Sequence, residues 1–188
     1  MKLIIGIGNP DPQYKETRHN VGWQFLDWLR KKFDASPFED NPKIFGEVAK
    51  IDVEGMKGWL LKPHTYVNES GKAVAKAKSW AKAKNDDIVV VQDDLDIPFG
   101  NCKLSYGKHS GGHKGIESVI KALKTTKFHR IRIGTGVRAL DKARQQSDTK
   151  RDAFVKEYVL KTFTPSERDE LRGIFKACHL RLLQALKS

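Results

Sequence analysis

The chain has 188 residues, of which 31% are charged and 39% are hydrophobic, and its formal net charge is +12. This length suits one domain with a substantial buried core, and the excess of positive charge indicates a polyanionic partner. No apolar run is long enough for a transmembrane helix, and the run after Met1 is too short for the core of a signal peptide, so we expect a cytoplasmic protein.

The first predicted element is a β-branched strand over residues 2–7, which leads into a polar loop that ends at Asn20. An amphipathic helix follows, because apolar residues recur at three- and four-residue spacing: Val21, Phe25, Trp28, Leu29 and Phe33. We expect Thr17 to cap this helix and His19 to lie near the C-terminal end of a strand, where open α/β sheets place their sites. A dinucleotide-binding loop is a poorer interpretation, because the third glycine is missing and Pro10 interrupts the helix start.

Strands and helices alternate along the rest of the chain. The predicted strands cover residues 44–53, 58–62, 88–91, 101–106 and 129–134, and the predicted helices cover about 71–84, 116–123 and a C-terminal segment capped by Thr164. An acidic loop at 92–96 follows a β-branched run that is typical of a strand buried on both faces. We therefore predict an α/β fold, a single three-layer domain over residues 1–188 with a mixed central sheet flanked by helices on both faces.

Three further features have simple interpretations. Residues 137–152 are basic and show no hydrophobic period, which predicts a mobile basic loop. Cys102 and Cys178 are too few for a disulfide framework or a zinc site, so we expect reduced thiols. His109 and His113 lie four residues apart, but no glutamate separates them and a glycine pair disfavours a helix, so we expect no metal site and interpret His113 as a brace for its loop.

Four loops, each after a predicted strand, carry polar side chains that are suited to chemistry. In chain order they hold Asn9 with His19, then Asn68, then Asp93, and then His113 with Lys114. Because strand ends of an α/β sheet gather their loops along one edge, we expect these side chains to form a single site.

Motifs in these loops and in a later strand have the order and spacing of one known family. They are Gly8-Asn9-Pro10 with Thr17-Arg18-His19-Asn20, Lys62-Pro63-x-Thr65-Tyr66-x-Asn68, Asp93-x-Leu95-Asp96-x-Pro98, Gly111-Gly112-His113 and the segment 128–134. The chain therefore resembles the bacterial-type peptidyl-tRNA hydrolase family, from Leu3 to about Glu170. The resemblance implies an esterase that cuts the bond between a peptide and the 3′ ribose of tRNA, works as a monomer and needs no metal or cofactor.

The resemblance also implies the roles of the catalytic residues. His19 matches the base that takes a proton from water as the water attacks the ester carbonyl, and Asp93 matches the carboxylate that holds this imidazole. Asn9, which we count with the catalytic residues, and Asn68 match amides that handle the peptide end and disfavour a free α-ammonium. We expect water to be the nucleophile, because no serine or cysteine accompanies His19 in its loop.

The residues expected to bind tRNA surround this centre. Tyr14 and Tyr66 match aromatic positions beside the site, where each either contacts the terminal adenosine or packs in the core. Lys103 and Arg132 match basic residues that hold the terminal phosphate, a contact that gives position and not sequence. Lys114 completes the predicted set.

The chain departs from the family pattern at three positions. Lys114 stands where an asparagine orients substrate or water, Val67 replaces a methionine, and Ser105 replaces a second phosphate-binding lysine. A cation cannot accept a hydrogen bond, so Lys114 either opposes formation of the imidazolium or points outward and binds a backbone phosphate. The alternative function is an RNA-binding protein of this fold without hydrolase activity, as in plant intron-splicing relatives, and the presence of four residues argues against it: Asn9, His19, Asn68 and Asp93.

Overall fold

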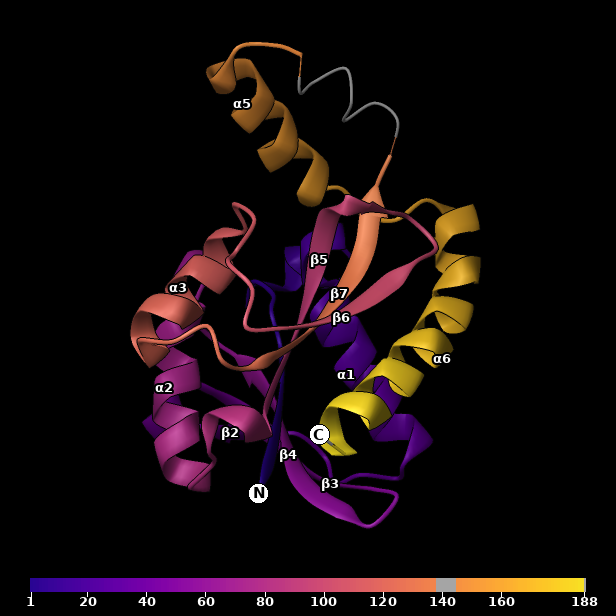
Figure 1. Cartoon of the computed structure of the whole chain (residues 1–188). Helices are drawn as coiled ribbons and strands as arrows, with labels where there is room; N and C mark the ends of the chain where they lie inside the picture. Colours follow the sequence, from indigo (N-terminus) through magenta and orange to yellow (C-terminus); the bar gives the residue numbers. More distant parts are fainter. Residues whose placement is uncertain (138–144, 188) are drawn as a thin grey trace.

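The computed structural model describes residues 1–137 and 145–187, and a seven-stranded mixed sheet forms its centre (Figure 1). The strands are β1 (Lys2–Gly6), β2 (Glu39–Asn41), β3 (Gly46–Val53), β4 (Met56–Pro63), β5 (Ile88–Pro98), β6 (Cys102–Tyr106) and β7 (His129–Gly136). Their order is β2-β3-β4-β1-β5-β7-β6, in which the pairs β4-β1, β1-β5 and β5-β7 are parallel and the outer pairs are antiparallel. The predicted α/β class with a mixed sheet is confirmed.

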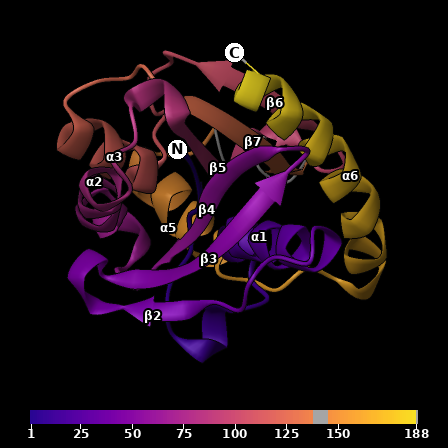
Figure 2. The same cartoon turned by 90° about the horizontal axis from the view of Figure 1, so that it is seen from below.

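Helices cover both faces of the sheet, as Figure 2 shows from below. The α-helices of the described residues are α1 (Val21–Lys32), α2 (Ser70–Ala81), α3 (Lys114–Leu123), α5 (Asp148–Val159) and α6 (Pro165–Lys187). Side chains of β1 alternate between the two layers: Ile4 packs in the cluster of α1 and α6, whereas Leu3 and Ile5 pack in the cluster of α2 and α3. This alternation produces the predicted three layers.

Strand β5 is longer than the sequence predicts, and the acidic segment 92–96 is strand instead of loop. Asp93 and Asp94 pair with the backbone of β7, the neighbouring parallel strand. Acidic residues are depleted in strands, but here each of these carboxylates has a basic partner on its own side of the sheet. Because successive side chains of a strand point to opposite sides, Asp93 binds His19 whereas Asp94 binds Arg132.

The predicted basic loop at 137–152 is wrong for its last part. Residues 148–152 begin helix α5, while residues 138–144 lie outside the described residues. Helix α5 has no continuous apolar stripe, so its sequence carries no helical period. Ion pairs within one turn support it instead, as between Arg151 and Asp148, whose charged atoms are 3.1 Å apart.

The two predicted helix caps have different outcomes. Thr17 does not cap α1, because its hydroxyl donates to the carbonyl of Tyr14 at 2.8 Å and a 3₁₀ turn over Arg18–Asn20 leads into the helix. Helix α6 begins as predicted, with reciprocal side-chain to backbone hydrogen bonds between Thr164 and Glu167 at 2.7 and 3.2 Å. Among the described residues, no helix combines the length and the hydropathy that a bilayer span requires.

Candidate active site

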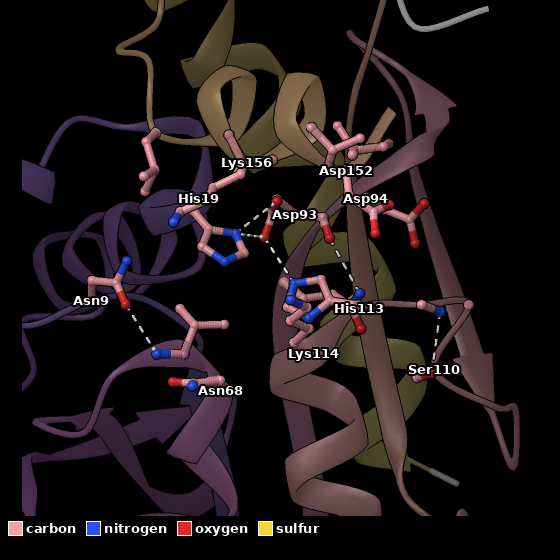
Figure 3. Close-up of a pocket in the computed structure, with 18 of the residues that line it drawn as sticks. Asn9, His19, Asn68, Asp93, Asp94, Ser110, His113, Lys114, Asp152 and Lys156 are labelled. Carbon is pink, nitrogen blue, oxygen red and sulfur yellow. Dashed lines mark hydrogen bonds and ion pairs between the residues drawn. The ribbon is translucent and has the colours of Figure 1, made fainter. Parts of the chain in front are cut away.

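The imidazole of His19 and the carboxylate of Asp93 form the centre of the site (Figure 3). Nδ1 of His19 lies 2.9 and 3.0 Å from the two carboxylate oxygens of Asp93. An ionised carboxylate only accepts hydrogen bonds, so Nδ1 carries the proton and Nε2 keeps a free lone pair. The His19 side chain is 17% exposed and that of Asp93 only 2%. The imidazole, and not the carboxylate, is therefore the group that solvent and substrate can reach.

His113 binds the same carboxylate, at the oxygen Oδ1 that also lies closest to Nδ1 of His19. Its Nδ1 accepts hydrogen bonds from the backbone amides of Gly115 at 3.1 Å and Ile116 at 3.3 Å, so this side chain is the N-cap of α3. Its Nε2 therefore donates to Asp93, at 3.0 Å. A Cβ on Gly115 would lie 3.0 Å from the His113 ring and 2.8 Å from Val67, which explains the glycine. Sequence reasoning gave His113 only a bracing role, although its place before a predicted helix indicated a cap.

These contacts shift the acidity of both partners. Burial acts to lower the pKa of His19, but the charge of Asp93 and the hydrogen bond to it outweigh burial and raise the pKa above its usual value. Burial acts to raise the pKa of Asp93, but the charges of His19 and His113 and the hydrogen bonds from both hold it well below its usual range. Asp93 therefore stays ionised near neutral pH, and His19 is a stronger base than a free imidazole.

Asn9 is fixed by Asn20, at the end of its own loop, and by Val67 from another loop. Asn20 bonds both backbone groups of Asn9, with its Oδ1 accepting from the amide and its Nδ2 donating to the carbonyl, each at 2.9 Å. The Asn9 side-chain oxygen accepts from the backbone amide of Val67 at 3.0 Å. The acceptor end of this amide is therefore occupied, and its NH₂ group is the end left for a ligand.

Arg18 ties the segment that carries His19 to the connection between α5 and α6. It is 5% exposed, and its guanidinium donates to the carbonyl of Thr162 at 2.7 Å and to the carboxylate of Glu167 at 2.6 Å. The same group lies over the Tyr158 ring, 4.6 Å from its centre. No local pattern in the sequence indicates this role, since the partners of Arg18 lie more than a hundred residues away.

A cleft of about 1180 Å³ opens over these groups. Six of the nine predicted site residues line it: Asn9, His19, Tyr66, Asn68, Asp93 and Lys114. Helix α5 supplies the opposite wall with Asp152 and Lys156 (Figure 3), and Arg151 of the same helix also lines the cleft. Sequence reasoning missed this wall, because it treated the start of α5 as a loop and the rest as undefined.

The predicted tRNA-binding residues divide into two groups. Lys114, at the start of α3, is exposed in the cleft, and so is Tyr66, whose hydroxyl donates to Asp11 at 2.7 Å. Tyr14 is half-buried and is not part of the cleft lining. The remaining pair lies at the edge of the cleft, since Lys103 and Arg132 face each other across β6 and β7 and the Nε of Arg132 donates, at 2.7 Å, to Asp94, a lining residue.

His19, Asp93 and His113 also have the spacing of metal ligands, since one ligand atom from each lies within 4.8 Å of the others. However, the imidazole nitrogens that face the carboxylate both donate hydrogen bonds to it, and the second nitrogen of His113 is occupied by the start of α3. A metal ion there would have to replace both protons. The arrangement therefore fits a hydrogen-bonded relay better than a metal centre.

This α/β fold presents, beside a large cleft, an imidazole nitrogen that can accept a proton, which is the arrangement of a hydrolase that uses a general base. A family model described as peptidyl-tRNA hydrolase matches residues 3–188. The chain belongs to the peptidyl-tRNA hydrolase family.

Individual relatives agree with this assignment. A peptidyl-tRNA hydrolase of Neisseria meningitidis is 44% identical over 72% of this chain and 70% of the relative, and one of Prochlorococcus marinus is 40% identical over 79% and 73%. A crystal structure of the peptidyl-tRNA hydrolase from Acinetobacter baumannii superposes with a TM-score of 0.85 at 28% identity, covering 100% of this chain and 89% of that one.

Proposed function

We propose that this chain hydrolyses peptidyl-tRNA at the ester bond to the 3′ ribose, with His19 as the general base and water as the nucleophile. The observation that carries the mechanism is the fixed tautomer of His19, whose Nδ1 is held by Asp93 while Nε2 is unblocked in the cleft. The family and the names of its relatives support the substrate and the reaction.

His19 acts twice in the proposed reaction, first as a general base and then as a general acid. A water beside Nε2 of His19 attacks the ester carbonyl and passes one proton to Nε2, so that a tetrahedral adduct and an imidazolium form together. Asp93 stabilises this imidazolium through the Nδ1 hydrogen bond. The C–O bond to the ribose then breaks, the 3′ oxygen takes the proton from Nε2, and the neutral base is regenerated with a free peptide acid and tRNA.

Asn9 and Asn68 suit recognition of the peptide end. The NH₂ group of Asn9 is a donor that an acyl carbonyl can accept, and Asn68 lies exposed in the same cleft. A free α-ammonium brings only donors, so it would leave the Asn9 NH₂ group unpaired and lose affinity. This arrangement favours N-blocked substrates over ordinary aminoacyl-tRNA.

We assign binding of the tRNA part of the substrate to the basic residues around the cleft. Lys103 and Arg132 lie next to each other at its edge and suit a phosphate group, while Lys114 lies inside it. Tyr66 is exposed enough to stack on a terminal base, whereas the position of Tyr14 supports the packing role that the sequence left open. We also propose that the enzyme is cytoplasmic, since its substrate arises on ribosomes. We further propose that it is a monomer. Light scattering on the purified chain tests the monomer.

The RNA-binding alternative without hydrolase activity is not favoured. The relatives reported above are named hydrolases, and the residues that argue against this alternative all line one cleft with the base in a productive tautomer: Asn9, His19, Asn68 and Asp93. A binding protein would have no need of such a tautomer.

The test is release of the acyl group from N-acetylaminoacyl-tRNA by the purified chain and by His19→Ala. We expect a loss of about 10²–10⁴-fold in kcat/KM for this variant, the usual contribution of a positioned base, and little cleavage of unblocked aminoacyl-tRNA by either protein. His109→Ala, which removes an exposed histidine four residues before His113, is the matched control and should keep full activity. Equal activity of the two variants, or an acyl-enzyme trapped by rapid quench, contradicts the mechanism.

A further inference from the structure

The two cysteines lie far apart in the sequence but are neighbours in the folded chain. Cys102 is the first residue of β6 at the edge of the sheet, and Cys178 lies within α6, which packs beside β6 (Figure 2). Both side chains lie in the core layer between α6 and the sheet, and the two thiols are near enough to shift each other's pKa. Neither lines the cleft, so the proposed hydrolysis leaves this pair without a role.

The two thiols have different surroundings. Cys178 is fully buried, whereas Cys102 is partly exposed and lies near the positive charge of Arg181, one turn further along α6 than Cys178. The hydrogen bond from Cys178 and the charge of Arg181 lower the pKa of Cys102 against the effect of burial. The contact with Cys102, together with burial, raises the pKa of Cys178. Cys102 is therefore the accessible, more acidic thiol and Cys178 the protected one.

From this arrangement we propose that Cys102 and Cys178 form an oxidation site for hydroperoxides, at which an intramolecular disulfide joins β6 to α6. The Cys102 thiolate attacks one peroxide oxygen, the O–O bond breaks, and Cys102 becomes a sulfenic acid while hydroxide leaves. The Cys178 sulfur then attacks the Cys102 sulfur, the S–O bond breaks, and the departing hydroxyl takes the Cys178 proton to leave as water. The two thiols lose two electrons, which reduce one hydrogen peroxide to two waters.

The position of the pair determines what the disulfide does. Cys102 points toward α6, and the next residue, Lys103, points to the opposite side of β6. The bond therefore forms on the side of the sheet away from Lys103 and leaves the predicted phosphate contact free. Because it links the C-terminal helix to an edge strand across a long loop, it should stabilise the fold.

The test uses the full chain, reduced, freed of reductant and treated with hydrogen peroxide under native conditions. We expect the intact mass to fall by two hydrogens, a non-reducing digest to yield one peptide pair joined through Cys102 and Cys178, and Tm to rise until a dithiol reverses the change. If both thiols still react with an alkylating agent, or if only crosslinks between chains form, the proposal is overturned.

Matched serine variants separate the two roles. In Cys178→Ser, Cys102 should stop at the sulfenic acid and be captured by dimedone, whereas in Cys102→Ser the remaining Cys178 should stay unmodified. Arg181→Gln changes an exposed side chain and should slow the oxidation of Cys102 at least about twofold, because it lowers the thiolate fraction. Equal capture at both cysteines, or an unchanged rate in Arg181→Gln, contradicts the assigned roles.

Discussion

In the wall of the cleft formed by strand ends, the reactive side chains are held by partners on other elements, whereas α5 in the opposite wall carries charged side chains that pair within their own helix. His19, Asp93 and His113 form one chain of hydrogen bonds, and it begins at the amides of α3. On α5, Arg151 pairs with Asp148 one turn away. Bond breaking requires fixed geometry, whereas peptides of varied sequence require an adaptable surface, so we propose that the α5 wall is the adaptable one.

Asp93→Asn breaks the fixed wall at its centre and should have the largest effect. We expect kcat to fall by about 10²–10⁴-fold, because the neutral amide no longer stabilises the imidazolium. The carboxylate raises the pKa of His19, so its loss lowers that pKa and should move the acid limb of the pH–rate profile to lower pH. Asp94→Asn, which alters the neighbouring carboxylate bound to Arg132, is the control and should leave the acid limb in place.

His113→Asn tests the outer part of the same hydrogen-bond chain. Asparagine can still cap α3, but it removes the imidazole N–H that binds Asp93. The negative charge of Asp93 then acts on His19 alone, so the pKa of His19 should rise and the acid limb should move to higher pH, opposite to Asp93→Asn. Activity at neutral pH should fall about tenfold. A shift in the same direction for both variants would show that His113 does not act through Asp93.

Arg18→Met loosens the link between the two walls. It leaves the partly buried carboxylate of Glu167 without its guanidinium, so the free energy of unfolding should fall by about 2 kcal/mol in denaturant titration. Because the backbone beside His19 loses support, kcat should fall several-fold while KM changes less. Arg168→Met removes an exposed pair with Glu16 and should cost less than about 0.5 kcal/mol. Equal losses in both variants contradict a special role for Arg18.

Lys114→Asn changes a charge that lies in the cleft but has no role in the hydrogen-bond chain. A lysine there opposes the positive charge that forms on His19 during attack, so its replacement should raise kcat about twofold to fivefold. The acyl-release assay measures this directly. An unchanged or lower rate would mean that the lysine contributes to substrate binding at this position.

Lys156→Ala alters only the adaptable wall and should have the smallest effect. Lys156 lines the cleft on α5, and a single surface contact to a phosphate or peptide should change KM about twofold and leave kcat unchanged. Lys150→Ala, on the same helix but outside the cleft lining, is the control. A large loss of kcat in Lys156→Ala would show that the α5 wall takes part in the chemistry.

The same contrast explains what could be predicted from the sequence. Strands with alternating or continuous apolar residues, and the reciprocal cap between Thr164 and Glu167, depend on neighbours along the chain and were therefore predictable. Helix α5 was not, because no apolar stripe identifies it. The partners of Arg18 and the meeting of Cys102 with Cys178 were not predictable either, since these contacts join distant segments and have no local pattern.

The cap that His113 places on α3 has a consequence for the division of work between the two histidines. Nδ1 of His113 accepts from two backbone amides and its Nε2–H donates to Asp93, so both nitrogens of this ring are committed to the fold. The two imidazoles have their centres only 5.3 Å apart, yet His19 alone of the pair keeps a ring nitrogen available to the reacting water. The second histidine beside the base therefore adds order to the site and leaves the chemistry to the first.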